Sequence, residues 1–160
     1  MILFFDTSAL LKLFVREEYS EAICQASRAA SLIVVSQLTW VEMCAALGLK
    51  QRTRQIDVPQ ATQALQELRD EWDRFSKFAV DQALIITAGE LALTFGLRAY
   101  DSLQLASAQR AHSQVGSNLA FTCFDKQLNA AATALGIHTL NPCGGQVLQS
   151  CREASVQTCA

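Results

Sequence analysis

Apolar residues in this chain fall into short continuous runs separated by longer segments with helical spacing. The runs at residues 2–5, 32–35 and 119–124 are almost wholly apolar, as strands are when a parallel sheet buries both of their faces. Residues 78–80 and 137–140 are weaker runs that we also interpret as strands. Helical segments separate successive runs, and this alternation predicts a parallel sheet with helices on both of its faces.

Two of the expected helices have informative faces. The segment over residues 59–75 is the clearest helix, because Leu65, Leu68 and Trp72 recur at steps of three and four. The helix expected over residues 37–51 is apolar on two faces. We expect one face to cover the sheet, while a neighbouring helix or a second subunit explains the other face equally well.

Composition limits the classes of protein to which this chain can belong. Its 160 residues, 51% of them hydrophobic and 18% charged, are sized for one domain with a packed core. No apolar run approaches the roughly 20 residues of a membrane-spanning helix, and no signal-peptide pattern opens the chain. We therefore expect a soluble, cytoplasmic protein with no membrane partner. Because the pattern weakens after residue 140, we expect a domain over 1–140, followed over 141–160 by a tail or a short helix.

Acidic residues stand where apolar runs end and helices begin. Asp6 follows the first run and Asp125 follows the run at 119–124, while Glu42 and Asp101 lie on helices between them. The carboxyl ends of parallel strands share one edge of a sheet, so these acids are expected to converge there. Converging carboxylates repel one another until protons or a divalent cation relieve the repulsion. Oxygen ligands of this kind suit Mg²⁺ or Mn²⁺, which are typical of enzymes that act on phosphodiesters.

Asp6, Asp101 or Asp125 taken alone is more typical of a helix cap than of a catalytic residue, and we interpret Asp81 as a cap. Thr7 or Ser8 is also a suitable cap for the helix after the first run. Glu42 differs because it lies inside an apolar helix, where its carboxylate needs a cation, a hydrogen-bond partner or solvent. His112 is isolated in the sequence and forms no acid and base pair with another histidine.

Cysteines and cations add little to this interpretation. The six cysteines contain no C-x-x-C pair, and Cys123 is expected to act as a small hydrophobic residue. The net charge of −2 is unusual for a protein that binds nucleic acid. Lys50, Arg52 and Arg54 cluster at the end of one helix. They are either RNA-binding residues or a solvated helix end at which the helix dipole favours cations.

Three sequence segments, taken with Glu42, carry a family resemblance. They are FDTSALLK at residues 5–12, RAYDSLQLASA at 98–108 and FDKQL at 124–128. Together they closely resemble the PIN-domain ribonucleases, and most closely the VapC-type toxins of toxin and antitoxin pairs, over roughly residues 1–140. The resemblance implies a three-layer α/β/α fold with a central, mainly parallel sheet of four to five strands.

The resemblance also implies a site and a chemistry. One or two Mg²⁺ or Mn²⁺ ions would be held by four acids and would activate a water that cleaves RNA; these acids are Asp6, Glu42, Asp101 and Asp125. Thr7 or Ser8 would orient Asp6 through hydrogen bonds. Related chains often carry threonine or serine two residues before the last acid, where this chain has Cys123, and Thr122 is the nearest hydroxyl.

Partners follow from the same resemblance. Such toxins form homodimers, act on RNA, and are silenced by a small antitoxin protein that blocks the acidic site, often with a basic side chain. One alternative is a catalytically silent PIN-fold module that binds RNA or protein. A phosphatase of the haloacid dehalogenase type is disfavoured, because that chemistry needs a second aspartate where Ser8 stands.

Overall fold

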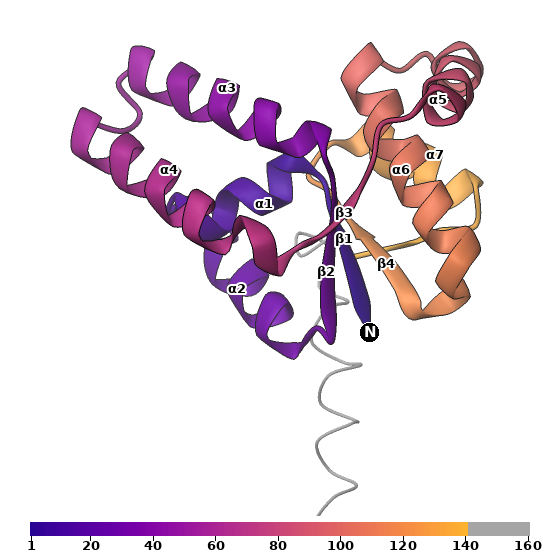
Figure 1. Cartoon of the computed structure of the whole chain (residues 1–160), viewed down its shortest axis with the longest axis horizontal. Helices are drawn as coiled ribbons and strands as arrows, with labels where there is room; N and C mark the ends of the chain where they lie inside the picture. The colour runs from indigo at the N-terminus through magenta and orange to yellow at the C-terminus, as the bar shows by residue number, and fades with distance from the viewer. Residues whose placement is uncertain (141–160) are drawn as a thin grey trace, which may run out of the picture.

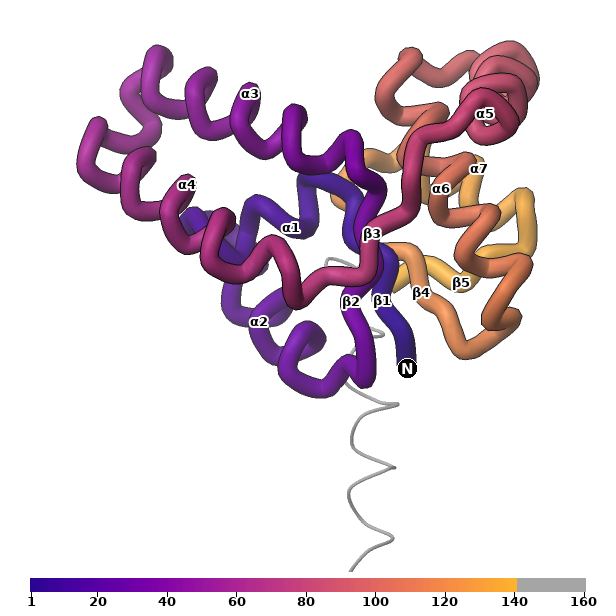
Figure 2. Tube along the Cα trace, in the orientation of Figure 1, coloured from indigo at the N-terminus to yellow at the C-terminus, as the bar shows by residue number. Residues whose placement is uncertain are grey.

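Five parallel strands form the centre of this computed structural model, which describes residues 1–140 (Figure 1). Their order across the sheet is β3-β2-β1-β4-β5, which can be followed in Figure 2. The strands are β1 (Ile2–Phe5), β2 (Leu32–Ser36), β3 (Ser76–Phe78), β4 (Leu119–Thr122) and β5 (His138–Thr139). The predicted parallel sheet is confirmed, and the predicted tail lies outside the described residues.

Within residues 1–140, seven α-helices cover the two faces of this sheet. They are α1 (Thr7–Phe14), α2 (Ser20–Ala29), α3 (Leu38–Arg52), α4 (Val58–Glu71), α5 (Gln82–Phe95), α6 (Ala99–Val115) and α7 (Lys126–Ala134). Helices α1 to α4 pack on one face and α5 to α7 on the other (Figure 1). The three-layer α/β/α architecture expected from the sequence is therefore confirmed.

The central strands are apolar throughout because each contributes to two cores. In β1, Phe4 belongs to the core under α5 to α7, whereas Leu3 and Phe5 belong to the core under α1 to α4. Phe4 packs against Phe121 of β4, with ring centroids 5.9 Å apart. Successive residues of a strand point to opposite faces, so burial on both faces requires an unbroken apolar run.

Two predicted strands differ from the structure by two residues, whereas β2 differs from its prediction by one residue at one end and β5 by one residue at each end. The third strand is Ser76–Phe78 rather than residues 78–80, because its pairing with β2 starts at Ser76 opposite Val34. The fourth strand ends at Thr122, two residues earlier than expected, since the backbone N–H of Phe124 turns to the Ser8 hydroxyl. Short edge strands and strand ends carry a weak apolar signal, and tertiary contacts set their limits.

The second apolar face of α3 is covered by a neighbouring helix. The Trp40 ring on α3 packs edge-on against the Trp72 ring after α4, with centroids 5.0 Å apart. Met43 and Leu47 are buried, and they share a core with Leu68 of α4. Of the two explanations left open by the sequence, the structure therefore shows the neighbouring helix.

The connections place the start of α1 and the start of α7 at one edge of the sheet. From β1 the chain first builds β2 and β3 on one side, and it later returns to build β4 and β5 on the other. This reversal makes a topological switch point between β1 and β4, beyond whose carboxyl ends open α/β sheets bind their ligands. The backbone N–H of Asp6 donates to Thr122 O at 3.1 Å, which holds the two strand ends together.

Capping explains where several helices begin and end. Asp6 itself caps α1, in place of the expected Thr7 or Ser8, and Asp81 caps α5 as predicted. Gly96 ends α5 with φ 64°, a left-handed conformation that costs glycine little. Helix α6 begins at Ala99, so Asp101 lies inside its first turn.

No single helix among residues 1–140 has both the length and the apolar composition needed to cross a bilayer. Helices α5 and α6 pass that test only when taken together, across a bend of 114°.

The packing between β1 and β4 gives a first prediction. Phe121 is fully buried in a central strand, so Phe121→Ala is expected to lower the free energy of unfolding by about 3–5 kcal/mol through reduced burial and the remaining cavity. Urea denaturation measures this change. Leu49→Ala is the control, because Leu49 is 53% exposed on α3 and its truncation should cost less than about 0.5 kcal/mol. Equal destabilisation of the two variants would contradict this account of the core.

Candidate functional site

Asp6 stands at the end of β1 with one carboxylate oxygen held in place. Ser8 donates to Asp6 Oδ2 twice, from its backbone N–H at 3.0 Å and from its hydroxyl at 2.7 Å. The Cys123 thiol lies 3.5 Å from the same oxygen. Asp6 is only 7% exposed, so these contacts fix the carboxylate at the sheet edge and leave Oδ1 without a bond in the described residues.

Glu42 is held from two other helices. The Thr7 hydroxyl donates to Glu42 Oε2 at 2.6 Å, and the side-chain amide of Gln104 donates to the same oxygen at 2.5 Å. Thr7 and Ser8 therefore have separate partners in the structure: Ser8 contacts Asp6, whereas Thr7 contacts Glu42. The hydrogen-bond partner that an acid inside an apolar helix requires is thus supplied by α1 and α6.

Gln104 is a site residue that sequence reasoning missed. Its side chain is fully buried, and its Nε2 also contacts the hydroxyls of Thr7 at 3.1 Å and Thr39 at 2.9 Å. A carboxylate only accepts hydrogen bonds, so the amide atom on Glu42 must be the nitrogen. The available signal was a polar residue between Leu103 and Leu105, in a buried stretch of helix.

Asp101 and Asp125 meet the site from the starts of α6 and α7. Asp125 caps α7 by accepting from the backbone N–H of Leu128 at 2.8 Å through Oδ1. The side chain of Asp101 makes no hydrogen bond and no ion pair within residues 1–140. In the first turn of α6, Asp101 therefore presents carboxylate oxygens that are available to bind an added cation.

Cys123 takes the place that a threonine or serine often has in related chains. Besides approaching Asp6, its sulfur accepts from the backbone N–H of Asp125 at 3.2 Å. The carbonyl oxygen of Cys123 accepts from the Asn129 side chain at 2.8 Å. Burial and the nearby Asp6 charge raise the pKa of the Cys123 thiol, so the thiol stays protonated.

Thr122, by contrast, is not brought to the acids. It pairs in register with Phe5, whose side chain lies in the core under α1 to α4, whereas Cys123 lies in the opposite core. The buried Thr122 hydroxyl has no hydrogen-bond partner among the described residues. The structure therefore does not bring this hydroxyl to the acids, because strand alternation turns it to the other face of the sheet.

The acids influence one another through their charges. Burial raises the pKa of Glu42, and the charges of Asp6 and Asp101 raise it further, while the bonds from Thr7 and Gln104 lower it. Burial also raises the pKa of Asp101, as do the charges of Asp6 and Asp125. Asp6, Glu42 and Asp125 therefore all lie within electrostatic reach of Asp101.

The donor set suits a hard divalent cation. None of the four carboxylates takes part in an ion pair within residues 1–140. In that part of the chain, no three His, Cys, Asp or Glu side chains are arranged around one point that could hold an ion. Mg²⁺ is commonly bound by one or two carboxylates with several waters retained, so a preformed cage is not required. Carboxylate oxygens that lack cationic partners provide such ligands.

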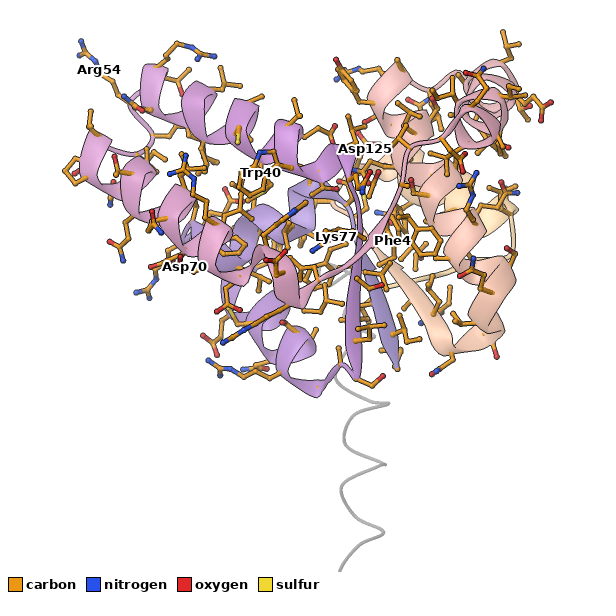
Figure 3. All side chains as sticks on the ribbon, in the orientation of Figure 1. Phe4, Trp40, Arg54, Asp70, Lys77 and Asp125 are labelled. Carbon is orange, nitrogen blue, oxygen red and sulfur yellow. The ribbon has the colours of Figure 1, made fainter. Side chains whose placement is uncertain are left out.

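The basic residues expected to bind RNA lie elsewhere. Lys50 donates to Glu17 at 2.8 Å and to Gln55 at 3.1 Å. Arg54 lies at the outer tip of the arm formed by α3 and α4, far from Asp125 (Figure 3). Arg52 is exposed on the last turn of α3. The structure does not bring Lys50, Arg52 and Arg54 to the acids.

Known proteins share this fold and sequence pattern. A family model described as PIN domain matches residues 3–133. The chain is 33% identical over 141 residues to Ribonuclease VapC46 of Mycobacterium tuberculosis, and the match covers 88% of this chain and 97% of that protein. FitAcB from Neisseria gonorrhoeae has a similar fold, with a TM-score of 0.61 and 19% identity. The match covers 90% of this chain and 99% of the FitAcB chain. A toxin-antitoxin complex from Klebsiella pneumoniae also has a similar fold, with a TM-score of 0.58 and 20% identity. That match covers 80% of this chain and 90% of the other chain.

Proposed function

The chain belongs to the PIN-domain family, and on that premise we propose that it is a Mg²⁺- or Mn²⁺-dependent endoribonuclease, the toxin of a toxin and antitoxin pair. The observation that supports this proposal is the grouping of Asp6, Glu42, Asp101 and Asp125 at the switch point of the sheet. Burial and the charges of neighbouring acids raise the pKa values of Glu42 and Asp101, and none of the four carboxylates forms an ion pair within residues 1–140. A relative of similar length is named as a ribonuclease.

The side chains of this site would hold the ion and orient the RNA phosphate. Bound Mg²⁺ or Mn²⁺ supplies Lewis-acid activation of water and neutralises charge on a phosphodiester. Asp6 would offer Oδ1, because Ser8 holds that carboxylate through Oδ2, and Glu42 would offer a carboxylate that Thr7 and Gln104 hold through Oε2. Holding these oxygens in place before the ion binds avoids an entropic cost on binding.

We also propose an antitoxin partner and a homodimer. A basic side chain of a small antitoxin would find four carboxylates without ion pairs at the site. A similar fold occurs in a solved toxin-antitoxin complex, which supports this partner. Ile85, Ile86 and Leu93 are exposed large apolar residues on α5, and such a surface supports contact with a second copy.

The test of the nuclease is RNA cleavage with matched variants. Wild-type protein is expected to cut one member of a transfer and ribosomal RNA panel with Mg²⁺ or Mn²⁺, and not with EDTA. Asp101→Asn, which removes charge without removing a hydrogen bond, should reduce the rate by more than about 100-fold, since even outer partners of metal ligands contribute 10–100-fold. Asp70→Asn is the control, because exposed Asp70 lies on α4 outside the site.

Each other outcome has a clear meaning. Equal cutting by wild type and Asp101→Asn would identify a contaminating nuclease and overturn the proposal. Binding of RNA by wild type without cleavage under any metal condition would favour the silent RNA-binding module instead. A rate reduction in Asp70→Asn equal to that in Asp101→Asn would show that the charge of the whole protein, rather than the site, controls the rate.

A further inference from the structure

We propose that Arg98 and Lys126 form a cationic rim that binds the phosphate backbone of RNA beside the four acids. The proposal rests on the nuclease function above, because it assigns the residues that bring the substrate to that site. It replaces the trio at the end of α3 as the candidate RNA-binding residues.

The sequence places each cation next to one of the acids. Arg98 is the N-cap residue of α6, three positions before Asp101. Lys126 is the first residue of α7, directly after Asp125. Each cation therefore lies at the edge of the site from which one acid is supplied.

A side-chain bridge brings the two segments together in space. The Gln127 amide donates to the carbonyl oxygens of Phe95 at 2.9 Å and Gly96 at 3.2 Å. These contacts tie the first turn of α7 to the turn that leads into α6. Arg98 and Lys126 thus extend from adjoining segments, although 28 positions separate them in the sequence.

Both cations are available to bind an anion. Arg98 and Lys126 are exposed, and neither forms an ion pair or a side-chain hydrogen bond within residues 1–140. Lys12 and Lys50, by contrast, both pair with Glu17, at 2.9 Å and 2.8 Å.

Helix stability does not explain these positions. The helix dipole favours acids at an N-terminus and cations at a C-terminus. Arg98 and Lys126 stand at the N-termini of α6 and α7, where a positive side chain is unfavourable. Departures from a local rule of this kind are expected where function requires them. A phosphate beside these side chains would be attracted by both the cations and the helix ends.

The ligand class follows from the charge around the site. RNA that approaches four carboxylates in a chain of net charge −2 meets repulsion that a bound metal only partly offsets. Cations on the rim lower that barrier for the phosphates that flank the cut. An RNA backbone supplies such phosphates in succession, so it matches two adjoining cations beside one metal site.

The experiment measures RNA binding without catalysis. Fluorescence anisotropy of a labelled, mixed-sequence single-stranded RNA in EDTA would compare wild type with Arg98→Gln combined with Lys126→Gln. The double variant is expected to raise Kd roughly tenfold and to lower the slope of log Kd against log salt by about 0.7 for each phosphate that it no longer neutralises. The matched control is Arg52→Gln combined with Arg54→Gln, which changes net charge equally and should leave Kd nearly unchanged.

Folding and activity readouts separate the possible outcomes. The melting temperature of the rim variant should not fall, since its cations do not stabilise the helix ends. Absence of RNA binding by wild type, an unchanged Kd in the rim variant, or an equal rise in the control would overturn the proposal. Because the assay contains no metal, failure of wild type to cut RNA would count against the nuclease function alone.

Discussion

Glu42→Gln is expected to raise the melting temperature of the metal-free protein at neutral pH while reducing RNA cleavage by more than about 100-fold. Glu42 is partly buried, and its pKa is raised by that burial and by the charges of Asp6 and Asp101. Its ionised form therefore carries a cost in the metal-free fold. Glutamine removes the charge, and its carbonyl oxygen can still accept the hydrogen bond from Thr7. Activity and stability thus change in opposite directions.

The pH dependence of this stability difference has a definite sign. Because the folded-state pKa of Glu42 is raised above its unfolded value, the stability that the protonated acid contributes is fully present below the unfolded pKa of about 4.3. That contribution disappears as the pH rises through the folded-state pKa. The melting temperature of Glu42→Gln should therefore exceed that of wild type by little near pH 4 and by more toward pH 7.

Calorimetry of both proteins in EDTA across this pH range measures the difference. Shifts in other acids, such as the lowered pKa of Glu17, occur in both proteins and cancel. Glu67→Gln is the control, because the exposed Glu67 side chain accepts a hydrogen bond only from Gln63 within residues 1–140 and should show no such trend. Addition of Mn²⁺ should raise the melting temperature of wild type more than that of Glu42→Gln. A difference that shrinks toward neutral pH would contradict the assigned cause.

Gln104→Met is expected to lower both Mn²⁺ affinity and RNA cleavage by about 10–100-fold, the usual effect of removing a partner that orients a metal ligand. Methionine fills the buried volume with an unbranched side chain but donates no hydrogen bond. Glu42 then keeps its burial and retains only one of its two donors. The metal-free protein should be destabilised by about 1–3 kcal/mol for the buried groups left unsatisfied.

A double-mutant cycle tests whether Gln104 acts through Glu42. If it does, Gln104→Met should reduce cleavage far less in a Glu42→Gln background than in wild type, because the ligand that it orients is already altered. Additive effects on the logarithmic scale would mean that Gln104 acts independently of Glu42. Ser107→Ala controls for removal of a polar group on the same buried face of α6, since the Ser107 hydroxyl bonds only to Leu103 O of its own helix within residues 1–140.

The sequence correctly predicted the layers of this fold for a local reason. A strand buried on both faces, as β1 is, must be apolar at every position, and this requirement is visible in Ile2–Phe5 without any partner. Amphipathic helices such as α4 show their buried face through spacing alone. The sheet order β3-β2-β1-β4-β5 became known only from the structure.

The site was only partly predictable. Four acids after strands and on helices were evident from spacing and from resemblance, and their catalytic and metal-binding roles stay a prediction. The contact between Gln104 and Glu42 joins positions 62 residues apart, so no local pattern shows it. Lys50 is a candidate for RNA binding from the sequence because its bond to Glu17, a residue far away in the sequence, is likewise not visible in any local pattern.

By itself, then, the sequence determined the elements of the sheet and the types of side chain at its edge, because burial and helix spacing act within a few residues. Only the tertiary structure decided that Ser8 holds Asp6 while Thr7 and Gln104 hold Glu42. It also decided that Arg98 and Lys126 extend from adjoining turns. These pairings depend on how α1, α3, α6 and α7 rest on the sheet, and that arrangement is fixed by packing between segments far apart in the chain.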